Sequence, residues 1–311
     1  MAQRLTSAEV MGLFEKLSNW GRWGKDDERG ALNFITDAKR AAAAALVKTG
    51  EMISMSLPLA TLTANDNPTP VTHLMMQAGT DSPRQSMAGV ADYFAISPHG
   101  FATTHLDALC HIFWQGKMYN GFDAAEVGSH GAKKCSIEVV SGGVVSRGVL
   151  LDIAKIKGVE WFEPGHHIFP EDLEAAEKDH GVRVEEGDVL LIRTARPKRR
   201  AAKRGWEPPT RGMIDMAGLD ASCLPWIHER KIAILGCDGT SDVIPSGYDD
   251  IGLPIHIGTL VVMGIHLIDN ADLEALSQQC ARAGRYAFQF VMAPLLLKRG
   301  TASPVNPLAV F

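Results

Sequence analysis

Short apolar runs dominate the chain after residue 50, and they constrain its fold more than any other feature. Each predicts a strand of about four to eight residues, because turn-forming residues bound it. The clearest runs are VTHLMMQ, YFAIS, RGVLLDI, DVLLIRT, KIAILGCD and YAFQFVMAPLLL. Residues 7–18, 37–48 and the stretch PEDLEAAEKDH have helical patterns, whereas LPIHIGTLVVMG fits a buried helix or a strand equally well. No linker rich in Pro, Gly or Ser divides the chain, so the sequence predicts one mixed α/β domain.

Composition excludes several classes of protein. The chain has 311 residues, 46% of them hydrophobic, and a net charge of -5. So mild a charge predicts no nucleic-acid partner, and no window approaches the roughly 18 apolar residues of a membrane span. The N-terminal residues MAQRLTSAEVMGLFEKL predict an amphipathic helix rather than a signal peptide. Five scattered cysteines without a C-x-x-C pair exclude a disulfide framework and favour a reducing cytoplasm: Cys110, Cys135, Cys223, Cys237 and Cys280.

The stretch from His105 to His111, HLDALCH, carries the strongest chemical signal. Asp107 lies among apolar neighbours, where a charge is costly to bury unless something compensates it, and a divalent cation is the natural compensation. Residues two apart on an extended segment face the same side, so His105 and Asp107 can hold one ion from a strand end. Asp107 and His111 share a face only if a helix begins there. We therefore expect a strand that ends near Asp107 and turns into a short helical piece. Two surface histidines and a capping aspartate are the alternative interpretation.

The longer window HGFATTHLDALCHIFWQGKMYNG, residues 99–121, resembles the signature of the cyclase family of metal-dependent hydrolases. That family includes bacterial kynurenine formamidases and isatin hydrolases, and its usual motif is H-x-G-T-H-x-D-x-P-x-H. Thr104, His105, Asp107 and His111 stay in register with it. Further segments resemble the family in order along the chain: RGVLLDI, GDVLLIRT, ILGCDGTSDVIPS, PIHIGTLVVMGIHLIDNADLEAL and APLLLKRGTASPVNPLAVF. RWGKDDERGALNF resembles the longer members. The resemblance implies a swivelling β/β/α-type single domain with a mixed, barrel-like central sheet and flanking helices.

The resemblance also assigns roles to individual residues. The positions that match metal ligands are His105, Asp107, His256 and Asp269, the last standing where the family generally has a glutamate. His111 matches the proton donor and acceptor. The first histidine of the motif falls on Phe101, which cannot bind a metal, and His99 replaces it only if the loop follows a different path. We therefore expect one divalent ion, and this donor set is compatible with zinc or manganese.

The implied activity is hydrolysis of the C–N bond of a small cyclic or aromatic amide by metal-activated water, with His111 moving the proton. Hydrolysis of a lactone or another ester is a close variant. A catalytically silent relative that binds a small ligand is the rival, because Phe101 and the short acid Asp269 weaken the metal site. Cys110 next to His111 suggests a thiol nucleophile, but this is disfavoured because the side chains of adjacent residues on an extended chain point in opposite directions. Four aromatic residues are candidates to contact a flat substrate, although such rings more often fill cores: Phe101, Trp114, Tyr119 and Trp23.

Three expectations concern organisation. Residues 1–50 are predicted to form an N-terminal helical extension packed on the core, and residues 51–311 the hydrolase domain. The basic run at 193–204 is expected to be a solvated excursion between two elements rather than an anion site. Asp238 and Asp242 are expected to cap the turn after KIAILG. Family members assemble as dimers or tetramers, so the resemblance implies a homodimer or homotetramer.

Overall fold

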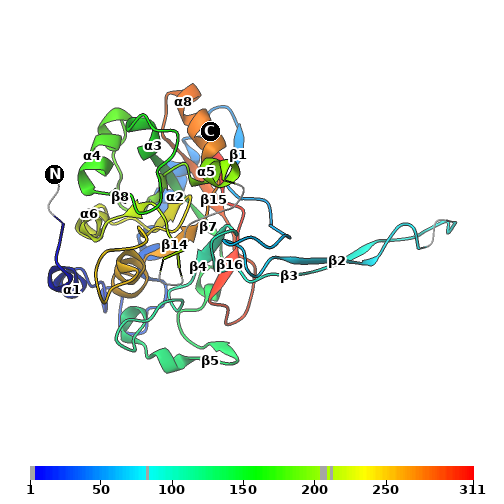
Figure 1. Cartoon of the computed structure of the whole chain (residues 1–311), viewed down its shortest axis with the longest axis horizontal. Coiled ribbons are helices and arrows are strands. Elements are labelled where there is room, and N and C mark those ends of the chain that lie inside the picture. Colours follow the sequence, from blue (N-terminus) through cyan, green and yellow to red (C-terminus); the bar gives the residue numbers. More distant parts are fainter. Residues whose placement is uncertain (1–3, 82–83, 204–208, 211–212) are drawn as a thin grey trace.

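A curled sheet, open like a half-barrel, forms the centre of the molecule, and helices flank it (Figure 1). The computed structural model describes residues 4–81, 84–203, 209–210 and 213–311. The sheet has nine strands in the spatial order β1 (Met52–Ser54), β17 (Leu308–Val310), β15 (Ala287–Met292), β7 (Val144–Asp152), β9 (Val189–Arg193), β13 (Ile234–Cys237), β14 (His266–Asp269), β4 (His105–Asp107) and β16 (Ala302–Pro304). The prediction of a single α/β domain with a mixed, barrel-like sheet is confirmed.

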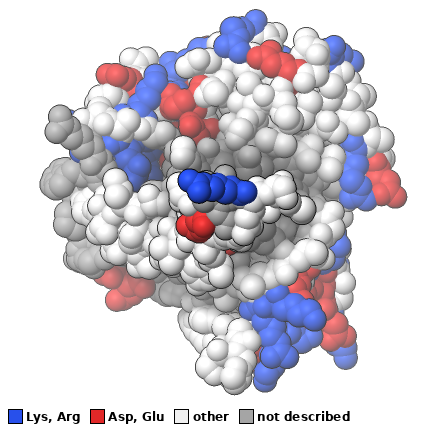
Figure 2. All heavy atoms as spheres, turned by 90° about the vertical axis from the view of Figure 1, so that its right-hand side faces the viewer, with Lys and Arg blue, Asp and Glu red and all other residues white. Residues whose placement is uncertain are grey.

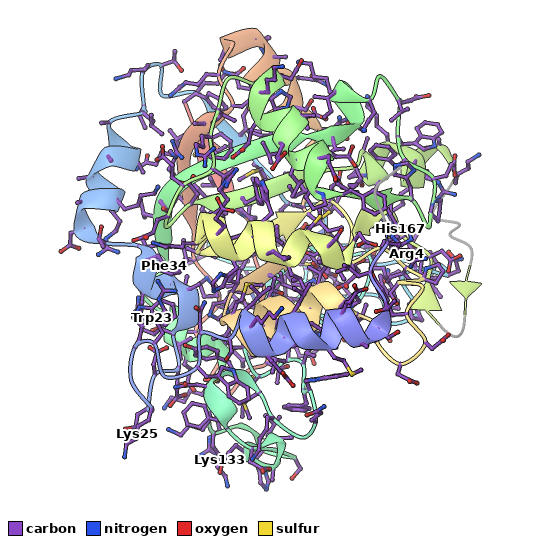
Figure 3. All side chains as sticks on the ribbon, turned by 90° about the vertical axis from the view of Figure 1, so that its left-hand side faces the viewer. Arg4, Trp23, Lys25, Phe34, Lys133 and His167 are labelled. Atoms are coloured by element: carbon purple, nitrogen blue, oxygen red, sulfur yellow. The ribbon has the colours of Figure 1, made fainter. Side chains whose placement is uncertain are left out.

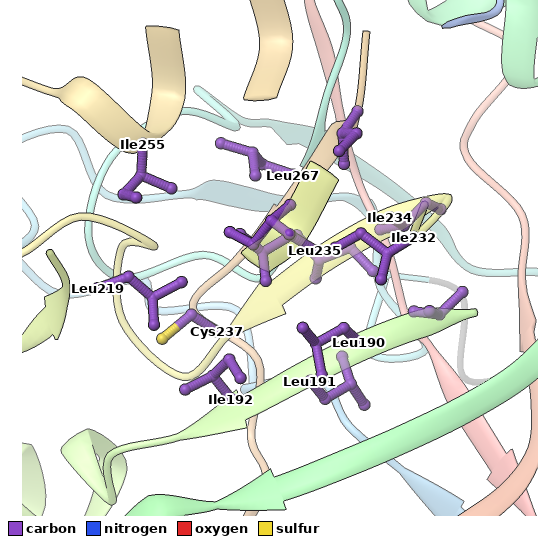
Figure 4. Close-up of a cluster of buried hydrophobic side chains, with 14 of the residues drawn as sticks. Leu190, Leu191, Ile192, Leu219, Ile232, Ile234, Leu235, Cys237, Ile255 and Leu267 are labelled. Carbon is purple, nitrogen blue, oxygen red and sulfur yellow. The ribbon is translucent and has the colours of Figure 1, made fainter. Parts of the chain in front are cut away.

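The four central strands are parallel and the outer ones antiparallel. β7, β9, β13 and β14 pair in parallel, and β4 joins β14 in antiparallel register. Every residue of β9, β13 and β14 is buried. Parallel strands covered on both faces have continuous rather than alternating apolar sequences, which explains the runs DVLLIRT and KIAILGCD. Figure 4 shows this packing, with Leu190 on β9, Leu235 on β13 and Leu267 on β14 in one cluster.

Three helical segments lie side by side on one side of the sheet (Figure 3). They are α1 (Ser7–Lys16), α6 (Leu224–Arg230) and the π-helical segment η6 (Ile257–Met263), which continues the single turn α7 (Pro254–His256). The ambiguous run LPIHIGTLVVMG is therefore a helix, and every residue of η6 is buried. The remaining α-helices are α2 (Asp37–Ala44), α3 (Ile153–Ile156), α4 (Pro170–Asp179), α5 (Arg196–Ala202) and α8 (Glu274–Ala283).

Shorter elements complete the fold. Single 3-10 turns are η1 (Gly30–Phe34), η2 (Tyr119–Gly121), η3 (Ala124–Glu126), η4 (Ile137–Val140) and η5 (Ala221–Cys223). Two-stranded pairs are β2 (Thr72–Gln77) with β3 (Ala91–Ala95), β5 (Val127–Gly128) with β6 (Gly131–Ala132), β8 (His167–Ile168) with β12 (Gly218–Leu219), and β10 (Pro209–Thr210) with β11 (Met213–Ile214). Among the described residues, no helix combines the length and the apolar composition that crossing a membrane requires.

Residues 4–50 pack directly on the rest of the chain. Val10, Phe14 and Leu32 belong to the main buried cluster. At the closest approach the Ala31 amide donates to the carbonyl oxygen of Gly264 at 2.7 Å. Gly264 has φ +67, and a Cβ there would lie 2.5 Å from the Tyr119 ring. Only glycine therefore fits this contact. The boundary at residue 50 stays a prediction.

The β2–β3 hairpin projects from the body as a long arm (Figure 1). Every residue of both strands is exposed, including Leu74, Tyr93, Phe94 and Met76, of which Met76 is 72% exposed. Figure 2, which views the molecule along this arm, shows a mostly uncharged surface around it. An isolated two-stranded hairpin is marginally stable at best in water, so this arm lacks the support that other strands of the fold receive.

The expectation that the basic run is a solvated excursion is wrong for Arg193, Arg196 and Arg199, which are buried, whereas Lys198 and Lys203 are exposed. Arg193 ends β9 and binds two carboxylates, with Asp152 and Glu274 both at 2.8 Å. The run continues as α5, whose Arg196 and Arg199 are also buried. Arginine stays charged, so its burial requires acidic partners, and those partners come from distant parts of the chain.

Candidate metal centre

Strand β4 brings His105 and Asp107 to one side of the sheet. His105 Nε2 lies 3.4 Å from Asp107 Oδ1, so the expected same-side geometry and the strand end at Asp107 are confirmed. The expected helical piece after it is wrong. A turn follows instead, in which the His111 amide donates to the Ala108 carbonyl at 3.0 Å. This turn still returns the His111 ring to the cluster, within 6.4 Å of the His256 ring.

The second predicted ligand region meets the first. His256 ends α7 and Asp269 ends β14, where Asp269 is paired with His105 across the sheet. His256 Nε2 lies 3.7 Å from Asp107 Oδ2 and 3.4 Å from Asp269 Oδ2. The four residues predicted as metal ligands therefore converge on one buried place.

His99 joins this cluster, and Phe101 does not. His99 Nδ1 lies 3.0 Å from Asp107 Oδ1, and its ring stacks on His111 at 3.7 Å. The loop reaches this path through Gly100, whose φ of +126 is disfavoured for other residues. Phe101 turns aside and packs against a small apolar cluster of Ile214, Met216 and Ile244. The different loop path that His99 requires is therefore present.

The carboxylate of Asp107 fits a bound cation. The residue is fully buried, and neither of its oxygens has a hydrogen-bond partner, because the nearby histidine nitrogens do not meet hydrogen-bond geometry. A buried carboxylate is strongly unfavourable unless a cation, here a metal ion or a protonated histidine, lies beside it. Two ligand sets share Asp107, one with His99 and His111 and one with His105 and Asp269, and the atoms of each lie within 4.8 Å of one another. Mixed imidazole and carboxylate donors suit zinc, manganese or iron.

Outer hydrogen bonds orient two of the rings. His105 Nδ1 donates to the Thr103 carbonyl at 2.8 Å, which leaves Nε2 directed at Asp107. His256 Nδ1 donates to Asp242 Oδ2 at 2.5 Å, which leaves its Nε2 directed at Asp107 and Asp269. Such carboxylate–histidine pairs commonly fix metal ligands. Asp242 also accepts the amides of residues 255 and 256, so it caps α7 besides holding the ring.

The charges of the cluster favour a positive species at the ligand nitrogens. Burial alone would lower the pKa of His105, but the carboxylates of Asp107 and Asp269 raise that pKa to about 9. The pKa of His256 is raised in the same way, against burial, mainly by Asp269 and Asp242. A metal ion and a proton compete for the same Nε2 atoms, so the carboxylates that hold a proton there also favour a cation.

His111 has the opposite electrostatics. Burial lowers its pKa to about 4, and the rings of His99 and His256 act in the same direction, although Asp107 opposes them. The imidazole is therefore neutral at pH 7 and able to accept a proton. Cys110, its neighbour, is buried, and burial raises the pKa of its thiol to about 12. That agrees with the expectation that a Cys110 nucleophile is disfavoured.

The other aromatic candidates lie in the packing between the N-terminal segment and the body. Trp114 packs edge-on against Phe14, with ring centroids 5.5 Å apart, and lines a cavity of about 670 Å³ beside α1 and η6. Tyr119 is buried, and its hydroxyl donates to Asp27 Oδ2 at 2.9 Å. Trp23 contacts Phe34 edge-on, with centroids 5.0 Å apart (Figure 3). Their role in substrate binding, like that of Phe101, stays a prediction.

Two residues near the centre were not predicted as part of it. Asp242 was expected to cap a turn, and Asn270, which follows Asp269, was given no role. Asn270 is buried and bonds to the loop that carries His99. No local spacing signals either residue, because each acts on a ligand that is distant in sequence.

Comparison with known proteins identifies the family of this centre. Residues 40–242 match the family described as "Putative cyclase". The chain belongs to this cyclase family. A solved structure described as a novel cyclase is similar at 32% identity, with a TM-score of 0.85, and the match covers 96% of this chain and 99% of that one. No curated protein matches the chain.

Two isatin hydrolases share the fold of this cyclase. Isatin hydrolase A from Labrenzia aggregata, solved with benzyl benzoate, is 20% identical with a TM-score of 0.60, covering 86% of this chain and 94% of that one. Isatin hydrolase A from Ralstonia solanacearum is 18% identical with a TM-score of 0.60, covering 89% of this chain and 98% of that one. The match to the family ends at residue 242, whereas these structural matches extend over most of the chain.

Proposed function

We propose that this cyclase is a metal-dependent hydrolase that cleaves the C–N bond of a small cyclic or aromatic amide. The buried Asp107 carboxylate carries the proposal, because it has no hydrogen-bond partner and three histidine nitrogens approach its oxygens. His105, Asp107, His256 and Asp269 would hold the ion, with His99 in the role of the missing motif histidine. A bound divalent metal with an open position supplies hydroxide near neutral pH and polarises a carbonyl.

His111 supplies the proton transfer in this proposal. Its ring stacks on His99 at the edge of the cluster and is only partly buried, so a substrate can reach it. Because the low pKa keeps the ring neutral, His111 accepts a proton from the attacking water. It then returns that proton to the leaving nitrogen, which departs as a neutral amine. His111 therefore completes the reaction without changing its own charge overall.

The substrate class rests on two supports. The isatin hydrolases that share the fold act, by their name, on isatin, a small cyclic amide. Beside His99 in this chain, Phe101 packs with Ile214, Met216 and Ile244 into an apolar cluster, which we propose as the contact for the ring of the substrate. Hydrolysis of a lactone or ester is the second candidate, because one isatin hydrolase is solved with the ester benzyl benzoate.

A silent ligand-binding relative is the rival. It was motivated by Phe101 and by the short acid at position 269. His99 lies beside Asp107 in place of Phe101, and Asp269 Oδ2 lies 3.4 Å from His256 Nε2. Both observations favour an intact metal site over a silent one.

The decisive experiment measures metal and turnover together. Protein purified without added metal is assayed for zinc, manganese and iron, and then for turnover of lactams, formylated anilines, lactones and aryl esters. We expect a stoichiometric ion and lactam hydrolysis that a chelator and His105→Ala both abolish. Faster turnover of esters than of lactams would favour the second candidate. Metal-free protein that binds a lactam unchanged would establish the rival.

Two further parts of the proposal concern the setting of the enzyme. We propose a cytoplasmic location, which the five buried cysteines without disulfide partners support. We also propose a homodimer or homotetramer, in which a second copy of the chain covers the apolar arm. The resemblance to the family and the exposure of Leu74 and Tyr93 support this assembly.

A further inference from the structure

Asn270 links the end of β14 to the loop that carries the first two histidines. Its Nδ2 donates to the carbonyl oxygens of Gly100 at 2.8 Å and Thr103 at 3.1 Å. The Thr103 oxygen also accepts the Nδ1 proton of His105 at 2.8 Å. One carbonyl therefore connects the Asn270 amide to the ring of His105.

The backbone of Asn270 is held as firmly as its side chain. Its amide donates to the Gly239 carbonyl at 2.8 Å, and its own carbonyl accepts the Thr104 hydroxyl at 2.6 Å. The residue has φ +56, a left-handed conformation that asparagine adopts more readily than most residues. Side chain and backbone thus make three hydrogen bonds to residues 100–104.

A buried arginine orients the amide. Arg196 Nη1 donates to Asn270 Oδ1 at 3.4 Å, and its Nη2 lies 3.2 Å from Asp66 Oδ2. Arg196 can only donate, so the amide oxygen faces the guanidinium and the amide nitrogen faces the loop carbonyls. This arginine of the basic run therefore contacts the residue that bonds to the histidine loop.

Contacts other than those of Asn270 hold individual residues of the loop: His99 Nε2 lies 3.0 Å from Thr301 Oγ1, and the Thr104 carbonyl accepts the Val305 amide at 3.1 Å. Ala102, Thr103 and Thr104 are buried, whereas the His99 side chain is 28% exposed, and Asn270 bonds to both ends of the 100–104 loop. We propose that Asn270 is a positioning residue, which holds the 99–105 loop so that His99 and His105 present their nitrogens beside Asp107. This inference rests on the proposed function, because it assumes that those nitrogens bind the metal.

Asn270→Asp tests the inference because its two effects on zinc affinity, the added negative charge and the lost hydrogen bonds to the loop, have opposite signs. The variant keeps the size, the left-handed tolerance and the contact with Arg196, but it replaces the donor to Gly100 and Thr103 with an acceptor. A negative charge near Asp269 would by itself strengthen cation binding. Loss of the loop anchor would weaken it by about 10- to 100-fold, as for other residues that orient ligands. We expect weaker zinc binding, measured as the dissociation constant in competition with a chromophoric chelator.

Two controls separate positioning from folding. Arg199→Gln alters another buried arginine of α5, which pairs with Glu163 at 2.8 Å, and it should lower the melting temperature without changing zinc affinity. If Asn270→Asp does not fold, Asn270→Gly keeps the left-handed backbone, removes the amide and should weaken zinc binding to a similar extent. Amide hydrogen exchange of residues 99–105 in metal-free protein should accelerate in either Asn270 variant.

The outcomes distinguish the two proposals. Unchanged or tighter zinc binding in both Asn270 variants, or unchanged exchange of the loop, overturns the positioning role while leaving the proposed function intact. Native protein that binds no zinc, manganese or iron overturns the proposed function and the metal part of this inference. Faster loop exchange in the variants would then still support the anchoring of the loop.

Discussion

His256 Nε2 lies 3.7 Å from Asp107 Oδ2, although the two residues come from opposite halves of the chain. The antiparallel pairing of β4 with β14 produces this proximity, because it sets His105 opposite Asp269, and α7 adds His256 from above the same strand ends. The site thus depends on the complete sheet. The charged residues that the sheet brings together can be tested one at a time by substitution.

Asp107→Asn tests whether this carboxylate holds the metal. The variant keeps the shape of the side chain but removes the charge, so we expect no metal uptake and no hydrolysis. Without metal, its melting temperature should fall below that of the native protein, because the raised pKa values of His105 and His256 keep those buried rings charged and the variant removes a carboxylate that compensates them. Chelator-treated native protein is the comparison, and calorimetry is the measurement.

The matched control is another buried aspartate. Asp152 pairs with Arg193 at 2.8 Å, so Asp152→Asn breaks a compensated ion pair. We expect that variant to keep its metal and to lose about 3 kcal/mol of unfolding free energy. Metal uptake by Asp107→Asn would contradict our interpretation of its carboxylate.

His111→Gln should reduce kcat while leaving the metal content unchanged. Removing a general base typically slows a reaction by about 100- to 10,000-fold. In the native enzyme His111 must be unprotonated, and its pKa is lowered to about 4 by burial, so activity should persist below pH 6 and fall only as the pH approaches that value. The pH profile of kcat/KM tests this, with metal content measured at each pH. An acid limb at pH 6.5 with metal retained would exclude this role.

Much of this centre follows from the sequence, and the remainder depends on contacts across the fold. Alternation on β4 identifies His105 with Asp107, since a strand imposes a period of two on its side chains. The position of His99 was not predictable, because it depends on the backbone of Gly100 and on the distant amide of Asn270.

The basic run at 193–204 also shows that contacts between distant parts of the chain limit prediction from the sequence. A cluster of cations is usually solvated, and only the tertiary structure supplies the acids that pair with the buried Arg193 and Arg196.

The turn after Asp107 is a local failure of the sequence-based prediction. A spacing of four residues fits one turn of helix, but the His111 amide bonds back to Ala108 instead.

Tyr119→Phe tests whether Tyr119 stabilises the fold or contacts the substrate. Its hydroxyl bonds to Asp27, and its ring fills the space at Gly264, so we expect a loss of about 1 kcal/mol of unfolding free energy with kcat and KM unchanged. Chemical denaturation and steady-state kinetics on the same preparation give both numbers. A raised KM with unchanged stability would instead support the predicted contact with substrate.

The projecting arm should set the oligomeric state. Leu74 and Tyr93 face each other across the hairpin, and both are at least half exposed. If a second copy covers them, replacing both with serine removes apolar area from the interface twice in a symmetric dimer, once for each chain. We expect native protein to sediment as a dimer or tetramer and the double variant as a smaller species, with the metal content of each measured alongside. As a control, serine at the exposed Leu296 of the loop before β16 should leave the mass unchanged. A native monomer, or a variant with the native mass, would show that the arm has another partner.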